Sequence, residues 1–352
     1  MNKQEQQAEV ICEYMDSNKR IYRVTEEILS EYRTKYCYLD PDLQLARVLS
    51  GFVGTDSDAY ILYAVSMLGI ADSPSIAQVL MKFKALNSKL PILDAKNRDQ
   101  LRYRLKLLTD NGFLVLNKYS LIKDTSYGDG NCSTDVTFYS LCDSAVTFIN
   151  QRFNKRLRVN RWFQAKPKQE LIAVGSCAYT ATHLMKTSEY QEICPGDFKN
   201  RLTNTTMFMP IEMRMKRGDM NYYIGLVPSF LVQTKVMGAE ELQELIKNRL
   251  LLIRGYFEHR NTKGDPCYVI VCAENKQDFQ RMAAAMVNSD LLDNYFTNIY
   301  FTGEGALREC ALQEGGSVSD CIISIRRDDT NSQGFSVSSL DSPGRRTGIY
   351  KI

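Results

Sequence analysis

Basic residues between Lys96 and Lys123 are the strongest candidates for binding chemistry in this sequence. The segment holds seven lysines and arginines against two acidic residues, Asp99 and Asp110, so it carries +5 while the whole chain carries +3. Such a local excess, on a helix with free polar positions, suits phosphate contacts and base-edge hydrogen bonds in a DNA major groove. The predicted DNA contacts in this segment are Gln100, Arg102, Tyr103, Lys106, Lys118 and Tyr119. The alternative is a solvated helix face in a protein-binding module, and charge clustering favours DNA.

A second basic stretch, residues 151–168, contains seven basic residues and no acidic one. It could extend a DNA footprint along the phosphate backbone through Arg156, Arg158 and Arg161. Alternatively, its arginines pair with acidic residues of a neighbouring domain and Trp162 packs in a core. Both interpretations stay open.

Carboxylates in the second half of the chain offer a different chemistry, which is metal-dependent DNA cleavage. A PD-(D/E)xK nuclease needs two or three acidic oxygens for a divalent metal and a lysine that helps to orient the attacking water. Glu170, Asp197 and Glu212 are the candidate oxygen donors, with Arg214 at the lysine position. The set is incomplete, because arginine replaces lysine and a glycine interrupts the Pro-Asp pair. If this alternative holds, the cofactor is Mg²⁺ or Mn²⁺.

The elements that must position the first basic segment follow the order of a winged helix-turn-helix over Ile61–Ile122: helix, helix, basic helix and strand pair. Asp72 and Ser73 ahead of Pro74 predict a capped helix start. The third helix is expected over Ala95–Asp110. Its predicted buried stripe consists of Leu101, Leu105 and Leu108.

The strand pair after the third helix is the predicted wing. Asn111 and Gly112 predict the end of that helix. The alternation of Phe113–Leu116 predicts a strand that turns at residues 117–120, and residues 135–141 predict a strand that returns along it. A closing helix is expected from Cys142 to Phe153.

The second half alternates helices and strands, which predicts a three-layer α/β domain with a partly parallel sheet. One run, Cys267–Cys272, is continuously apolar and implies a strand covered on both faces. The predicted helices are residues 169–185, 239–259 and 278–286, and the predicted strands are residues 206–213, 221–227, 267–272, 298–302 and 319–325.

Two domains plus extensions are expected, because 352 residues exceed one ordinary core. The predicted parts are an N-terminal extension of two helices (1–54), a winged helix-turn-helix domain (55–153), a basic connector (154–168), an α/β nuclease-like domain (169–325) and a flexible tail (326–352).

The composition limits the cellular compartment and the kinds of cysteine or metal site that we expect for this chain. No apolar run approaches the roughly 20 residues of a membrane span, and the polar N-terminus does not resemble a signal peptide. The ten cysteines include no CxxC pair, and several lie in apolar runs, so we expect reduced, buried thiols. With two histidines, a histidine-rich zinc site is not expected.

Residues of the second half also resemble a known family. The residues that carry the resemblance are Met209–Arg214, a turn at Gly218, Tyr222–Ser229, and Arg249 and Tyr256 on a long helix. Together with the element order over residues 55–302, they resemble the replication-relaxation family of plasmid and conjugative-element proteins.

The resemblance implies a winged helix followed by a nuclease-like domain with a Pro-Asp on one strand and a Glu-x-Asp on the next. In this register Ile211, Gly225 and Val227 stand where the family has its carboxylates. The implied second domain is therefore a degenerate restriction-endonuclease-like core that lacks its metal-binding oxygens.

We expect a cytoplasmic, non-enzymatic DNA-binding protein with an accessory or regulatory role in the replication, transfer or transcription of a mobile element. Its expected partner is double-stranded DNA, with no membrane, metal or cofactor. A metal-dependent nuclease and a scaffold that joins other proteins are the alternatives. A homodimer through the N-terminal helices is compatible with the sequence, although no heptad pattern supports it.

Overall fold

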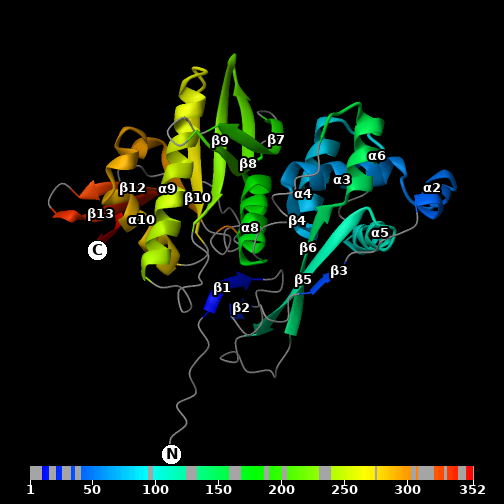
Figure 1. Cartoon of the computed structure of the whole chain (residues 1–352), viewed down its shortest axis with the longest axis horizontal. Helices are drawn as coiled ribbons and strands as arrows, with labels where there is room; N and C mark the ends of the chain where they lie inside the picture. Colours follow the sequence, from blue (N-terminus) through cyan, green and yellow to red (C-terminus); the bar gives the residue numbers. More distant parts are fainter. Residues whose placement is uncertain are drawn as a thin grey trace, which may run out of the picture.

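Two β-sheets with a helix between them organise the chain, which is mixed α/β as expected (Figure 1). The computed structural model describes residues 10–15, 21–25, 33–35, 41–93, 98–123, 133–157, 168–185, 190–199, 204–229, 239–273, 276–302, 307, 321–328, 331–339 and 346–351. Within these ranges, no helix combines the length and the apolar character needed to cross a membrane.

The helices of the first half are Asp56–Leu68 (α3), Ser73–Leu86 (α4), Arg98–Asp110 (α5) and Asp143–Phe153 (α6). The start of α4 and the bounds of α5 and α6 lie within about three residues of the prediction, whereas α3 begins before the predicted motif start at Ile61. The Asp72 side chain accepts a hydrogen bond from the Ser75 amide at 2.8 Å, which confirms the predicted cap of α4. Gly112 has a φ of 71°, in the left-handed region that glycine tolerates, and it follows the end of α5 as predicted.

The apolar faces of α4 and α5 are buried in one cluster, and the face of α5 is the predicted one. α4 contributes Ile76, Val79, Leu80 and Phe83, and α5 contributes Leu101, Leu105 and Leu108. The helical spacing of the α5 leucines therefore predicted correctly which side of that helix faces the core.

The first sheet is built on an antiparallel hairpin of Leu114–Lys123 (β5) and Ser133–Leu141 (β6). A short strand between α3 and α4, Ile70–Asp72 (β4), pairs with β6 and was not predicted. On its other edge β5 pairs with Ile21–Thr25 (β2) and Arg33–Lys35 (β3), and β2 pairs with Val10–Met15 (β1). Both edges of the hairpin are thus covered along part of their length.

Two predictions for this region are wrong. The N-terminal extension contributes strands β1, β2 and β3, not two helices; its one described helix is Pro41–Leu49 (α2). The β5 edge offers backbone amide and carbonyl groups, and pairing with them outweighs the local helix propensity of this segment. The predicted turn at residues 117–120 lies inside β5, which continues to Lys123 because β2, β3 and β6 pair along it.

The second sheet has the strand order β14-β13-β12-β11-β10-β9-β8-β7. Its strands are Tyr190–Lys199 (β7), Thr206–Arg217 (β8), Met220–Pro228 (β9), Cys267–Cys272 (β10), Ile299–Thr302 (β11), Ile323–Asp328 (β12), Asn331–Ser339 (β13) and Arg346–Lys351 (β14). The pairings of β9 with β10 and of β10 with β11 are parallel and the others antiparallel, so the predicted partly parallel sheet is confirmed. Strand β7 was not predicted.

The predicted flexible tail is also wrong for its described residues. Strands β13 and β14 extend the sheet beyond β12 in antiparallel pairs. A polar composition predicts mobility poorly here, because backbone pairing with the open edge of β12 requires no large apolar side chains.

Helices cover both faces of the second sheet. Lys168–Leu184 (α8) packs in one cluster with the inward residues Ile211 and Met213 of β8. Ala239–Asn261 (α9) and Lys276–Val287 (α10) pack in a second cluster with Val269 and Val271 of β10, while the alternate residue Ile270 belongs to the first cluster. This confirms the three-layer prediction and the burial of β10 on both sides. The 3-10 helix Asp290–Asn298 (η2) precedes β11.

Helix α8 lies between the two sheets and joins the halves of the chain (Figure 1). A Cβ atom at Gly175 of α8 would lie 2.9 Å from Cδ1 of Phe138 on β6, so the glycine permits this close approach. The buried α8 residues Cys177 and Ala178 belong to the same cluster as Leu101 of α5 and Ile211 of β8. The halves therefore share a continuous core, although the sequence suggested a connector between separate domains.

Buried thiols match the expectation for Cys177, Cys267 and Cys272. Each is buried, and none of the three forms a disulfide. They behave as small apolar side chains within the two clusters.

Candidate nucleic-acid interface

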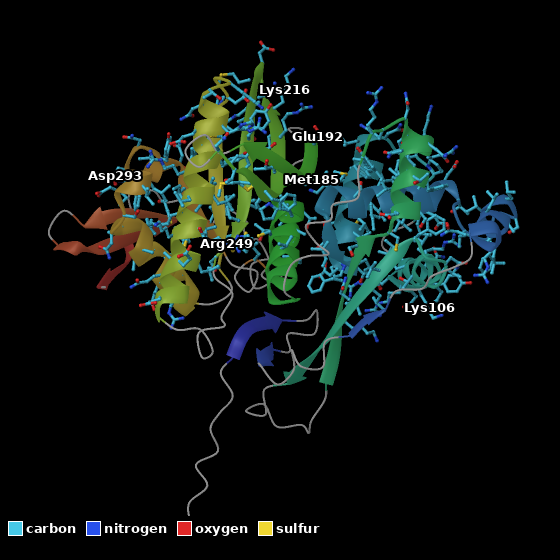
Figure 2. The ribbon with its side chains drawn as sticks, viewed as in Figure 1. Lys106, Met185, Glu192, Lys216, Arg249 and Asp293 are labelled. Carbon is cyan, nitrogen blue, oxygen red and sulfur yellow. The ribbon has the colours of Figure 1, made fainter. Side chains whose placement is uncertain are left out.

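Helix α5 has a buried face and a polar face. Leu101, Leu105 and Leu108 are at most 2% exposed, while the polar residues between them lie on the surface. The exposed residues of α5 are Arg98, Asp99, Gln100, Arg102, Tyr103 and Lys106, and they include the four predicted DNA contacts Gln100, Arg102, Tyr103 and Lys106. The fold thus brings the four predicted contacts of this helix to one solvent-facing surface, which we call the α5 face. Figure 2 shows Lys106 on the half of the molecule that contains α5 and the first sheet.

Arg104 lies on a different side of α5, and its charge is not available for binding because it is paired with a carboxylate. Its Nε donates to Oδ1 of Asp58 at 2.8 Å, and its Nη2 donates to the other carboxylate oxygen. Asp58 is fully buried and also closes the capping box with Thr55 at the start of α3. One of the seven basic residues counted in the sequence is therefore structural.

Lys106 makes a surface ion pair with Asp110, one helical turn away. The distance from Nζ to Oδ2 is 2.8 Å, and the Lys106 side chain is 76% exposed. Exposed pairs of this kind contribute little to stability and exchange easily with other anions. Tyr103, 59% exposed, presents a large ring beside this pair on the α5 face.

Arg102 lies close to one face of the first sheet. It interacts electrostatically with Tyr139 of β6, whose pKa is raised by burial and lowered in part by the charge of Arg102. The neighbouring Phe138 packs against Gly175 of α8. Because successive strand residues point to opposite faces, Tyr139 lies on the sheet face away from α8 and toward α5.

Lys118 and Tyr119, predicted at a wing turn, instead lie within β5. Lys118 is opposite Thr137 of β6 and opposite Arg33 of β3, and its side chain is half-buried. Tyr119 is opposite Val136. These residues therefore belong to the body of the sheet, and the loop that joins β5 to β6 lies outside the described residues.

Sequence reasoning missed Arg33 and Lys35 as members of this region. The three-residue strand β3 is too short to show an alternation, and only its pairing with β5 brings these basic positions beside Lys118. No local signal in the sequence indicates that pairing.

The basic stretch 151–168 begins within α6 and is described over residues 151–157 and at Lys168, where α8 begins. Arg152 forms an ion pair with Asp56 of α3, and Nζ of Lys155 lies 5.9 Å from the ring centre of Tyr63. Arg156 is exposed. Arg158 and Arg161 lie outside the described residues. The Arg152–Asp56 pair lies within the predicted domain 55–153, so it does not distinguish the DNA interpretation from pairing with a neighbouring domain, and Arg156 is a surface cation.

The alternative nuclease site centres on Glu212 of β8, and this carboxylate already has a partner. Arg260, near the end of α9, donates from Nε to Glu212 Oε2 at 3.0 Å and from Nη2 to the other oxygen. Its Nη1 lies 3.3 Å from Oδ2 of Asp265, and its Cζ lies 3.7 Å from the ring centre of Tyr223. Although burial alone lowers the pKa of Arg260, the hydrogen bonds and charge of Glu212 raise it overall.

Of the other nuclease candidates, the structure describes the side chain of Arg214, and it gives Asp197 and Glu170 by their backbone places in β7 and α8. Asp197 on β7 is opposite Phe208, four residues from Glu212 along β8, or about 13 Å at roughly 3.3 Å per residue. Glu170 lies in the first turn of α8. Nη2 of Arg214 lies 3.7 Å from Oε2 of Glu192, at the rim of the sheet. Among the described residues, no group of three carboxylate, thiol or imidazole side chains is placed to hold a metal ion.

The positions that correspond to carboxylates in the suggested family register are packed. Ile211 and Val227 are fully buried. A Cβ atom at Gly225 would lie 3.0 Å from Cε1 of Tyr256 and 3.0 Å from Cε of Met209. These positions serve the core of the sheet.

Comparison with known proteins found no family model, no curated protein and no solved structure that matches the chain. Its function is therefore inferred from its own residues.

Proposed function

We propose that this protein is a cytoplasmic, non-enzymatic protein that binds double-stranded DNA through a winged helix-turn-helix formed by α3, β4, α4, α5, β5 and β6. The pairing of β4 and β5 on either side of β6 supports this assignment, because it joins the helices and the hairpin into one unit. In this unit α5 enters the major groove.

The observation that carries the proposal is the two-sided character of α5. Its leucine stripe holds the helix to the core, while Arg102 and Lys106 remain exposed beside Gln100 and Tyr103. Arginine, lysine and glutamine can reach phosphates and base edges, and an exposed aromatic ring adds apolar contact. The connection between α4 and α5 is longer than the short turn of many helix-turn-helix proteins. We therefore identify α5 as the DNA-contacting helix by its exposed polar face and not by the length of the turn before it.

The resemblance to the replication-relaxation family suggests a biological setting for this activity. In that setting the protein is an accessory or regulatory factor for replication, transfer or transcription of a mobile element, with a second domain of degenerate nuclease-like architecture. The ion pair of Glu212 with Arg260 supports a structural role for that carboxylate and disfavours the Mg²⁺- or Mn²⁺-dependent nuclease alternative.

The test is a paired charge reversal on α5. Arg102→Glu with Lys106→Glu should weaken binding to a DNA duplex by about 100-fold at low salt. The slope of the logarithm of affinity against the logarithm of salt concentration should fall in magnitude by about two, because two phosphate contacts are lost. Far-ultraviolet circular dichroism should stay unchanged, because both side chains are exposed.

The matched control is Lys216→Glu with Arg217→Glu at the β8–β9 turn. Both residues are exposed, the change in net charge is the same, and Lys216 lies on the other half of the molecule (Figure 2). Equal losses in both variants would indicate a non-specific charge effect. A wild-type protein without salt-dependent DNA affinity would favour the scaffold alternative.

A further inference from the structure

Helix α2 has an inverted distribution of polar and apolar side chains. A helix on a protein surface normally turns an apolar stripe toward the core and polar residues toward water. Leu45 and Leu49, one helical turn apart on the same side of α2, are instead 56% and 79% exposed. Phe52, in the turn that follows the helix, is 48% exposed. Four of the seven exposed large apolar side chains among the described residues lie between Leu43 and Phe52.

The other side of α2 attaches the helix to the body of the protein through polar groups. Gln44 Nε2 donates to the carbonyl oxygen of Asn111 at 2.8 Å, and Arg47 Nη1 donates to the side-chain oxygen of the same residue. Asn111 follows α5 and is fully buried. Val48 lies on this side as well, since a Cβ atom at Gly54 would lie 3.2 Å from its Cγ1. These contacts fix the orientation of α2 and leave its leucines facing outward.

We propose that Leu45, Leu49 and Phe52, the α2 patch, form the contact surface of a homodimer, and that the occupant is the α2 patch of a second copy of this chain. The exposed residues from Leu45 to Phe52 are all uncharged: Leu45, Ala46, Leu49, Ser50, Gly51 and Phe52. A two-fold contact places the same patch on both sides, so a charge near the axis would meet its own copy. A neutral apolar surface is complementary to itself, and its burial removes apolar area from water.

The distribution of charge argues against nucleic acid or a membrane surface as the occupant. Phosphate backbones and anionic lipids attract clusters of lysine and arginine. Arg47 is the one basic residue from Leu45 to Phe52, and its guanidinium donates to the buried Asn111. Figure 1 shows α2 at one end of the longest axis of the molecule, a position from which a second copy can approach.

The size of the α2 patch predicts a reversible dimer. A stable interface buries about 800 Å² on each partner, and three side chains supply only part of such an area. We therefore expect a dissociation constant on the order of micromolar. Because α2 is bonded to the residue that follows α5, the dimer would present two copies of the α5 face. That consequence rests on the proposed function, whereas the dimer itself does not.

The experiment measures the molar mass of the full chain by light scattering, without DNA, over a roughly 100-fold range of protein concentration. The wild type should pass from monomer to dimer as its concentration rises. Leu49→Glu should raise the dissociation constant at least about 100-fold, because two-fold symmetry brings two carboxylates into an apolar contact. The matched control is Leu86→Glu, at the end of α4, where the leucine is 51% exposed. This control should dimerise as the wild type does.

Hydrogen exchange of the wild type locates the contact without any substitution. Amides of residues 44–53 should exchange more slowly at high than at low protein concentration, while those of residues 82–90 should exchange equally at both. A wild type that stays monomeric over the whole range would overturn the proposal. So would a dimer in which exchange of residues 44–53 is independent of concentration, or equal weakening by Leu49→Glu and Leu86→Glu.

The two proposals fail independently. Molar mass and hydrogen exchange are measured without DNA, so a monomeric wild type that binds duplex through α5 leaves the proposed function intact. A wild type that dimerises through α2 but has no duplex affinity at low salt would leave the dimer and remove the DNA-binding proposal.

Discussion

The guanidinium group of Arg104 on α5 is bonded to the buried carboxylate of Asp58 on α3, with Nε 2.8 Å from Oδ1. Two residues earlier on the same helix, Arg102 is exposed on the α5 face. The two arginines therefore differ in role. Arg104 attaches the helix to the core, and Arg102 presents its charge on the surface.

This separation predicts opposite phenotypes for matched substitutions on α5. Arg104→Met leaves the Asp58 carboxylate buried without its partner, and we expect the free energy of unfolding to fall by about 3 kcal/mol. Arg102→Met should change stability by less than about 0.5 kcal/mol and should weaken DNA binding. Urea unfolding and duplex titration of both variants test the pair. Equal stability of the two variants would contradict the assignment of Arg104.

Glu212 is predicted to stabilise the fold through its ion pair with Arg260, and not to bind a metal ion. Glu212→Ala removes the main anion beside a buried guanidinium and leaves Asp265 as the remaining carboxylate, so unfolding free energy should fall by about 3 kcal/mol. Glu192→Ala, on a carboxylate that is 49% exposed, is the control and should have little effect. Retained stability together with loss of a Mg²⁺-dependent plasmid cleavage would instead support the nuclease alternative.

Gly175 is predicted to set the distance between α8 and the first sheet. Replacing glycine by alanine inside a helix normally stabilises by up to about 1 kcal/mol. Here the added Cβ meets the Phe138 ring, and we expect Gly175→Ala to destabilise by about 1–3 kcal/mol. In a Phe138→Leu background the ring is absent, so the same change should become neutral or stabilising. A double-mutant cycle by urea unfolding measures the coupling, and additive effects would argue against this contact.

Alkaline pH should destabilise the protein through Cys267. Burial raises the pKa of this thiol from 9.0 to about 11. The unfolded thiol therefore loses its proton first, so the stabilising contribution is complete below about pH 9 and declines up to about pH 11, by about 1.4 kcal/mol per pH unit. The buried Tyr256, whose pKa is raised by burial and by Glu212, acts in the same direction at higher pH.

The Cys267→Ala variant tests this linkage. We expect its free energy of unfolding, measured in urea with a reductant present, to decrease less steeply with pH than that of the wild type between about pH 9 and 11. Below about pH 9 the two proteins should show the same pH dependence. Identical slopes across the alkaline range would show that the thiol keeps its ordinary pKa in the fold.

Local chemistry made much of this fold predictable. Asp72, Ser73 and Pro74 identify the start of α4, and the leucine spacing of α5 identifies its buried face, because caps and helical periodicity act within a few residues of each other. The continuous apolar run of β10 likewise indicates burial on both faces. The exposed residues of the α5 face follow from the same periodicity.

The pairing of distant segments could not be predicted in this way. Arg33 and Lys118 are far apart in the chain, and backbone hydrogen bonds between β3 and β5 bring them together. The same limitation explains why the sequence predicts helices where β1, β2 and β3 lie and a flexible tail where β13 and β14 lie. Their side-chain patterns are weak, and the open strand edges that stabilise them exist only in the folded sheets.

The sequence by itself determined which helix carries the polar, basic surface and where that helix ends. Tertiary structure decided which charges remain available. It placed Arg104 against Asp58 and Glu212 against Arg260, because ions removed from water require a partner of opposite sign. It also placed basic positions of β3 beside Lys118, since the register between strands depends on hydrogen bonds that no local pattern encodes.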